Sequence, residues 1–378
     1  MHLLFQMPLS LAALALATSL TAQRTWVVDA NNGPGTDFVD LPPAIAQAVD
    51  GDIVTVRSGT YRPFVTSKGL SLLGESGATI ASSISDFCSV SNLAAGKRFV
   101  MRGITFTDAS PFSLSSYYLV IDQCRGAVHL DGLATAGVRS VLVLLRSCGL
   151  VTVSHITATS GIEIESSRVS LHDASLQVAG LAAALRLTNS TVEATEVNLR
   201  GSPGHPHINP YPGVLMLSST LEVRGTVASL IAGGTASSAQ APAIWSDGPT
   251  LRLDPKIRLI GGIEGVTPTI AAMPALRVVS GQLGGTKRFD LSTQPQQLAV
   301  IFGALPMNPI DTNIGRVWLD LPTLFVVGAM VVDASGTWRL TTPNPSLPSL
   351  RGLAITYQAL DIGPQATTVS NAATLVLH

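Results

Sequence analysis

A short strand pattern that ends in small or polar residues recurs through the middle of this chain of 378 residues. Within each copy, apolar and polar side chains alternate, as expected for a strand with one buried and one wet face. Successive copies end 24, 19, 23, 30 and 30 residues apart, at Cys124, Cys148, Ser167, Ser190, Thr220 and Thr250. A repeat of this length, in which no single copy can bury its apolar face, predicts a solenoid. We therefore predict a parallel β-helix.

Stacking these copies in register would bury one aliphatic side chain from each turn in a continuous ladder. The predicted ladder consists of Ile121, Leu145, Ile164, Leu187 and Leu217. The composition agrees, because charged residues make up only 12% of the chain and glycine is abundant, which suits strands and tight turns. The formal net charge of −1 and the lack of a basic run argue against a nucleic-acid partner.

The first 22 residues contain no acidic side chain, lysine or arginine, and they include an apolar run from Leu9 to Ala17. Small residues follow, which predicts a signal peptide of residues 1–22, cleaved near Ala22. A transmembrane anchor is the alternative, but the run is shorter than the roughly 20 residues that a span needs. No later segment is long and apolar enough, so we predict a secreted or cell-surface protein without a membrane span.

Three cysteines, Cys88, Cys124 and Cys148, lie in the predicted solenoid. Cys124 and Cys148 hold the same position in successive turns, so their Cα atoms should lie about one strand spacing, roughly 4.8 Å, apart. That distance permits a disulfide, although side chains stacked in parallel register seldom reach the required torsion angle. The alternative is an unbonded stack of small buried residues, which we favour, and Cys88 has no assigned partner.

The segment from Trp26 to Tyr61 contains a strand, a Gly-rich loop, a helix expected over 42–49 with Asp40 as its N-cap, and a second strand from Ile53 to Arg57. A Gly59-Thr60-Tyr61 turn follows. This arrangement resembles the N-terminal cap of secreted pectin-lyase-like proteins, including pectin methylesterases. The resemblance implies a right-handed parallel β-helix with three strand faces per turn, whose open end is covered by the helix.

The strand spacing changes after about residue 285, and proline-rich connections separate strands of varied length. This pattern predicts a small antiparallel β-sandwich. The tail, with its Val369-Ser370-Asn371-Ala372 phrase, resembles β-rich C-terminal modules of other secreted bacterial proteins. We therefore divide the chain into a signal peptide (1–22), a cap and β-helix (23–285), and a C-terminal module (286–378).

Alternation predicts which side chains of the solenoid point outward. Aligning the repeats places Asp122, Arg146, Glu165, Thr188 and Ser218 in one solvent column, and Val120, Leu144, Glu163, Arg186 and Met216 in the next. Carboxylates and arginines could bind sugar hydroxyls or uronate groups. The alternative is a charge ladder between strands, which we favour because alternating signs neutralise each other.

The longest loop between clear repeats, residues 201–212, is stiffened by prolines and carries His205, His207 and Tyr211, with Asn198 and Arg200 at its base. Histidine suits proton transfer near neutral pH, so this loop is the first place to expect a site. A surface loop without chemistry is the alternative. Two histidines alone do not complete a zinc site, so we predict neither a metal nor a cofactor. His155 and His172 are expected to be exposed.

Motifs of the related enzymes are missing from the chain. The paired aspartates and the arginine motif of pectin methylesterases are absent, as are polygalacturonase motifs and an aspartate cluster for calcium. The leading hypothesis is a secreted, non-catalytic β-helix that binds a polysaccharide or cell-surface glycan and serves adhesion. The alternatives are a polysaccharide lyase or glycoside hydrolase, with Asp122, Arg146, Glu165, His205 and His207 as catalytic candidates and Glu163, Arg186, Asn198, Arg200 and Tyr211 in binding, and a structural spacer.

Overall fold

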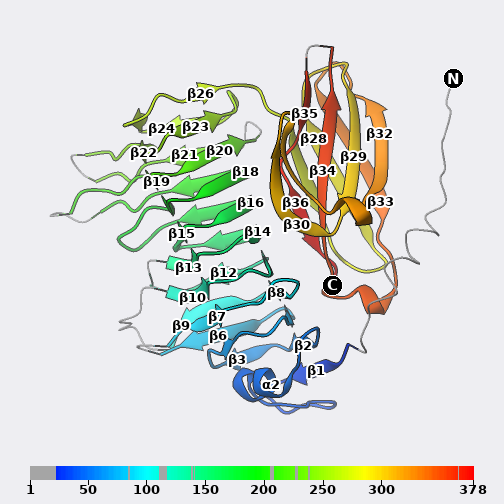
Figure 1. The fold of residues 1–378 in the computed structure, drawn as a ribbon. Helices are drawn as coiled ribbons and strands as arrows, with labels where there is room; N and C mark the ends of the chain where they lie inside the picture. Colours follow the sequence, from blue (N-terminus) through cyan, green and yellow to red (C-terminus); the bar gives the residue numbers. More distant parts are fainter. Residues whose placement is uncertain are drawn as a thin grey trace.

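The computed structural model describes residues 23–83, 86–109, 117–137, 139, 141–204, 208–225, 229–236, 239–364 and 366–378. It confirms the predicted fold class, a right-handed parallel β-helix with a short capping helix and an antiparallel C-terminal module. Figure 1 shows the turns stacked from the blue N-terminal end to the yellow-green end, with the module standing along one side. None of the helices in the described part of the chain has the length and apolar character needed to cross a membrane.

The solenoid consists of two parallel sheets. The narrow sheet contains β4 (Val65–Thr66), β7 (Cys88–Ser91), β10 (Tyr117–Asp122), β13 (Val141–Arg146), β15 (Gly161–Glu165), β17 (Leu185–Thr188), β19 (Val214–Leu217), β22 (Ile244–Ser246) and β25 (Ile263–Glu264). Each strand pairs with the strand one turn away, as the repeat predicts.

The wide sheet contains the remaining solenoid strands. They are β1 (Thr25–Val28), β2 (Ile53–Val56), β3 (Gly59–Tyr61), β5 (Ser71–Gly74), β6 (Ala78–Ser82), β8 (Arg98–Arg102), β9 (Thr105–Asp108), β11 (Ala127–Asp131), β12 (Ala134–Thr135), β14 (Leu150–Ala158), β16 (Arg168–Gln177), β18 (Thr191–Arg200), β20 (Thr220–Arg224), β21 (Leu230–Ala232), β23 (Thr250–Leu253), β24 (Arg258–Ile260) and β26 (Thr269–Ile270). The long strands β14, β16 and β18 bend at the left-handed residues His155, Asp173 and Glu196. The bends divide the wide sheet into two faces, which makes three faces per turn.

The helix α2 (Leu41–Gln47) covers the first turn of the solenoid. Asp40 is its N-cap and accepts a hydrogen bond from the backbone N–H of Leu41 at 2.8 Å. The helix begins one residue earlier and ends two residues earlier than expected, because Ala48 has extended backbone angles. The Lys68 ammonium group donates to the carbonyls of Ile45, Ala46 and Ala48, so it satisfies acceptors that the helix end leaves open.

The predicted aliphatic ladder is confirmed for its first four members, Ile121, Leu145, Ile164 and Leu187, which pair in register and are fully buried. The fifth assignment is wrong. Met216 continues the ladder and is buried, whereas Leu217 pairs with Thr188 and is only half-buried. The two-residue turn in this copy is Ser218-Ser219, one position earlier than the alignment placed it.

Each of these turns contains one residue in the left-handed conformation, and the residue after it is buried. The left-handed residues are Gln123, Ser147, Ser166, Asn189 and Ser218, and the buried residues after them are Cys124, Cys148, Ser167, Ser190 and Ser219. The three serines form a polar ladder, in which each hydroxyl accepts a backbone N–H from the preceding turn at 3.0 to 3.2 Å. All three cysteines are free and buried.

Replacing Ser190 by alanine should lower the free energy of unfolding by about 1–3 kcal/mol, because the buried N–H of Ser167 would lose its acceptor. Denaturant unfolding of the full chain measures this loss. Cysteine occupies the equivalent place in two other turns, so Ser190→Cys should cost less than Ser190→Ala. Equal losses for the two variants would contradict a role for this hydrogen bond.

The C-terminal module consists of antiparallel strands. One sheet contains β27 (Ala275–Val279), β28 (Thr286–Ser292) and β33 (Thr337–Pro343), and another contains β32 (Phe325–Val331), β29 (Leu298–Ala304), β34 (Ala354–Ile362), β35 (Thr367–Val369) and β36 (Ala373–Val376). The strands β30 (Pro306–Thr312) and β31 (Gly315–Leu319) form a separate hairpin. Phe289, Ile301 and Tyr357 lie in the module's own hydrophobic core. The strand β27 pairs with β28 although it precedes the boundary predicted at residue 286.

The module packs against the outer surface of the wide sheet. Trp318 of the hairpin and Ala372 share a buried apolar cluster with Leu150 of β14, and Ala354 and Val376 share another with Ile53, Leu73 and Val100. This packing buries side chains that strand alternation alone would leave in solvent. The expectation that His172 is exposed is therefore wrong, since only 2% of its surface is accessible, and His155 is half-buried.

Candidate functional site

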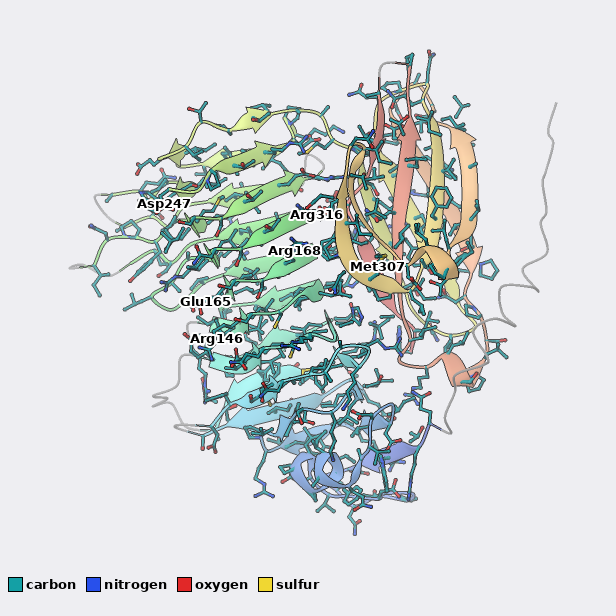
Figure 2. The ribbon with its side chains drawn as sticks, in the orientation of Figure 1. Arg146, Glu165, Arg168, Asp247, Met307 and Arg316 are labelled. Carbon is teal, nitrogen blue, oxygen red and sulfur yellow. The ribbon has the colours of Figure 1, made fainter. Side chains whose placement is uncertain are left out.

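The open face of the narrow sheet carries the first predicted column. Asp122, Arg146, Glu165 and Thr188 pair in register and point outward. Figure 2 shows Arg146 and Glu165 pointing away from the module. Ser218 does not join them, as Leu217 takes that place in the register, and the backbone N–H of Ser218 donates to Asp247 instead. The placement of Ser218 in this column was wrong, for the same reason as the placement of Leu217.

The charges of this column are largely paired. Arg146 donates from Nε and Nη2 to the two carboxylate oxygens of Asp122 at 2.9 and 3.0 Å. These hydrogen bonds hold the pKa of Asp122 below its ordinary value. The arginine is half-exposed, so the pair contributes little to stability. The geometry is that of a charge ladder between strands.

The second column pairs Glu163 of β15 with Arg186 of β17, with an Nη1 to Oε1 distance of 3.6 Å. The Tyr117 hydroxyl donates to Glu163 Oε2 at 3.3 Å. Burial raises the pKa of Glu163 above its ordinary value, and it outweighs the opposite effect of Arg186. Glu163 therefore keeps its proton to a higher pH than an ordinary glutamate does.

The loop candidates lie elsewhere. His205 and His207 fall outside the described residues. Asn198 and Arg200 lie on β18 beyond its bend, on a face of the wide sheet, and so they do not share the surface of Asp122 and Glu165. The backbone of Tyr211 is bonded to Ser202 and Gly234, which holds this part of the loop against the solenoid. The structure thus places Asn198 and Arg200 away from the candidates on the narrow sheet.

A groove, here called the turn groove, follows the left-handed turns along the solenoid axis. It consists of three consecutive hollows of about 510, 470 and 520 Å³, the first two sharing Asn92 and the last two sharing Ser147. The lining is almost entirely small, polar or cationic: Pro42, Ile45, Ala46, Val65, Thr66, Ser67, Lys68, Ser91, Asn92, Leu93, Ala94, Gln123, Arg125, Ser147, Cys148, Gly149, Ser166, Ser167, Arg168, Asn189 and Thr191. Each turn therefore offers the groove an amide or hydroxyl group.

Two arginines of the turn groove have no carboxylate partner in the part of the chain that the structure describes. Arg125 follows buried Cys124, and Arg168 follows buried Ser167, and both side chains are exposed. Among the residues that the structure describes, no carboxylate lines the groove. Sequence reasoning missed both residues. A signal existed, since each arginine stands two positions after a left-handed turn residue.

The module borders the turn groove. A Cβ atom added to Gly149 would come 3.3 Å from Oδ1 of Asn308, which lies on β30. Figure 2 shows Arg168 on the side of the solenoid that faces the module. Met307, which lies on β30 like Asn308, is on the facing side of the module. The hairpin of β30 and β31 thus approaches the groove at Gly149.

Buried acidic groups with shifted pKa values lie beneath the module. Glu193 of β18 is 3% exposed, and burial raises its pKa to about 6, although Arg224 and Arg316 oppose this. Its carboxylate accepts from the indole of Trp318 at 3.1 Å and from Arg316 at 3.2 Å. Because module side chains cover Glu193, this cluster joins the two parts of the protein and offers no access to a substrate.

A second buried cluster surrounds Asp131 of β11. Burial alone would raise the pKa of Asp131, but the hydrogen bond from His155 and the charge of Arg102 lower it. His155 in turn has a raised pKa, because the Asp131 carboxylate outweighs the effect of burial. Within the described ranges, no cluster of three or more histidine, cysteine, aspartate or glutamate side chains could hold a metal ion.

The fold and the groove define a β-helix protein with a long polar surface beside a docked β module. No family model and no curated relative matches the chain. Among solved structures, the chain is similar to full-length tailspike protein 2 from Escherichia coli O157:H7 bacteriophage CAB120, with 11% identity and a TM-score of 0.22. This match covers 94% of the chain and 64% of the tailspike, so the chain spans less than two thirds of that protein.

A second match is the enzymatically active domain of bacteriophage CBA120 tailspike protein 2. It has 10% identity and a TM-score of 0.17, and it covers 94% of this chain and 71% of that one. Neither similarity is close enough to support a functional argument. The assignment to the pectin-lyase-like superfamily and the signal peptide stay predictions.

Proposed function

We propose that this protein is a secreted, non-catalytic β-helix that binds an extended polysaccharide along the turn groove. The observation that supports this most is the continuity of the groove, whose three hollows follow one another along the solenoid axis. Successive turns repeat at about 4.8 Å, so the groove presents similar polar groups at a regular spacing. A polymer with a regular repeat of hydroxyl groups is the ligand that matches such a surface.

The charge of the turn groove favours an acidic polysaccharide. Its charged lining residues are Lys68, Arg125 and Arg168. The Lys68 ammonium group already donates hydrogen bonds to the carbonyls at the end of α2. Arg125 and Arg168 belong to turns that are two apart, or roughly 10 Å along the solenoid axis. Arg125 lies in the turn before β11, and Arg168 is the first residue of β16. A free guanidinium group forms paired hydrogen bonds with a carboxylate or sulfate. The ligand would therefore carry such groups at intervals along its chain.

A glycoside hydrolase is the second candidate function, and one observation favours it. Glu163 and Glu165 lie two residues apart on the same face of β15, so their carboxyl groups are roughly 7 Å apart. Burial raises the pKa of Glu163, as a general acid requires. A separation of about 6.5–9.5 Å is typical of inverting hydrolases.

The variant Arg125→Gln/Arg168→Gln should bind polygalacturonate at least about tenfold more weakly than the unchanged protein, because charge-assisted hydrogen bonds are lost. Affinity electrophoresis or calorimetry measures this effect. The matched control is Arg252→Gln/Arg339→Gln, which removes two exposed arginines that have carboxylate partners outside the groove. This control should bind like the unchanged protein.

Other outcomes separate the hypotheses. Failure to bind any member of a panel of acidic and neutral polysaccharides would reject a binding function. Equal affinity of the two double variants would reject the turn groove as the site. If the polymer is shortened during the measurement, and Glu163→Gln stops the shortening, hydrolysis replaces simple binding as the function.

A further inference from the structure

A separate hollow of about 840 Å³ lies between the last turns of the solenoid and the module, and we name it the junction pocket. Asp254, Lys256 and Met273 line it from the solenoid side, and Thr293, Gln297 and Asp361 from the module side. It is distinct from the turn groove, with which it shares no lining residue. Its volume suits a ligand of one or two sugar rings rather than a long polymer.

Asp361 of β34 is the unusual residue of the junction pocket. Only 2% of its surface is accessible, and burial raises the pKa of its carboxyl group. Its partners are neutral: the Thr293 hydroxyl donates to Oδ2, and the Gln297 amide lies 2.9 and 2.5 Å from its two oxygens when its nitrogen faces them. The wall of the pocket therefore contains a buried acidic group that forms no ion pair with any of the residues described.

Other buried carboxylates in the described chain are compensated differently. Asp131 lies against Arg102 and His155. Asp254, in the same pocket, accepts two backbone N–H groups, from Lys256 at 2.9 Å and Met273 at 3.0 Å. Asp361 has neither a cation nor a main-chain donor within the residues described, and the Lys256 ammonium group is bonded to the Ser292 hydroxyl at 2.7 Å. A buried carboxylate of this kind is stabilised when a cation binds beside it.

The rest of the lining suits a polyhydroxylated ring. Gln294 and Gln296 supply amide groups, and Thr368 supplies a hydroxyl group. Pro295 and Pro364 supply flat apolar surface against which the C–H face of a sugar can pack. We propose that the junction pocket binds a sugar with a free amino group, whose ammonium group lies against Asp361 and whose hydroxyl groups contact the glutamines and Thr368.

Calorimetry or ligand-observed NMR on the full chain tests this inference with glucosamine, glucose, N-acetylglucosamine and ethanolamine as probes. We expect glucosamine to bind at least about tenfold more tightly than the other three, since only it combines the ammonium group with the ring hydroxyls. Asp361→Asn should lower the affinity for glucosamine by about tenfold or more. Asp311→Asn, a change at an exposed carboxylate of the module, is the matched control and should leave it unchanged.

A second variant keeps the test informative if Asp361→Asn unfolds the module. Ala272→Trp places a large side chain in the pocket from the solenoid side, where Ala272 is exposed, and should abolish glucosamine binding. Polysaccharide binding in the turn groove should be unaffected by this change, so the two proposals can fail separately. The inference is overturned if no probe binds, if glucose or ethanolamine binds as tightly as glucosamine, or if both variants bind normally.

Discussion

Replacing Arg139 by methionine should lower the free energy of unfolding by about 3–5 kcal/mol. The Arg139 side chain is fully buried, and its Nε donates to Asp108 at 2.9 Å. Its other nitrogens donate to the carbonyls of Ser83, Asp86 and Tyr117. Methionine fills a similar space but satisfies none of these acceptors.

The physical reason for the large loss is the carboxylate that remains. Asp108 is 7% exposed at its side chain, and it also accepts a hydrogen bond from the Tyr118 hydroxyl at 2.9 Å. Removing the cation of a buried ion pair costs more than the intact pair contributes to stability. Denaturant unfolding of the full chain measures the loss. The control is Arg62→Met, because Arg62 also forms an ion pair but its side chain is 74% exposed. Its free energy of unfolding should fall by less than about 1 kcal/mol.

Similar losses for Arg139→Met and Arg62→Met would contradict this account. They would mean that Arg139 reaches water and that the turns around it are not closed as described. A large loss for Arg139→Met that disappears when Asp108 is also replaced by asparagine would support it directly, because the second change removes the negative charge that Arg139 balanced.

Replacing Trp318 by alanine should detach the module from the solenoid, at a cost of about 3–5 kcal/mol. Trp318 is 1% exposed and packs with Leu150 and Ala372 at the junction. Its indole N–H also donates a hydrogen bond to Glu193. The variant therefore leaves a cavity and also removes a hydrogen bond from the buried Glu193 carboxylate. We expect two separate thermal transitions in place of one, and faster proteolysis between the two parts.

Trp318→Phe separates the two contributions. Phenylalanine retains most of the apolar contact but has no N–H group, so the loss should fall to about 1–3 kcal/mol. Trp245→Ala is a control on the narrow sheet, where the tryptophan is half-buried and does not touch the module. A single unchanged transition for Trp318→Ala would show that this residue does not hold the module in place.

Much of the solenoid could be predicted from the sequence, because strand alternation and the repeat are local properties. Ile121, Leu145, Ile164 and Leu187 were assigned correctly from them. The error at Leu217 has a local cause as well: the repeat contains Ser218, Ser219 and Thr220 in succession, so composition could not show which one begins the turn. Only the left-handed backbone at Ser218 and its pairing decide the register.

The candidate site was less predictable. The pairs Asp122–Arg146 and Glu163–Arg186 followed from alignment of neighbouring turns. Arg125 and Arg168 were missed because an unpaired charge is recognised only when all its neighbours in space are known. The junction pocket was missed for the same reason, as its walls come from segments about one hundred residues apart, such as Asp254 and Asp361.

By itself, the sequence determined the parallel β-helix, its aliphatic ladder for four turns, the capping helix and the change to antiparallel strands in the module. These depend on side-chain alternation and on backbone preferences that act within a few residues. Tertiary structure alone decided which polar faces stay in water. Glu193 and His172 point outward from their strands, as alternation requires, yet the module covers them, since burial depends on contacts between residues more than one hundred positions apart.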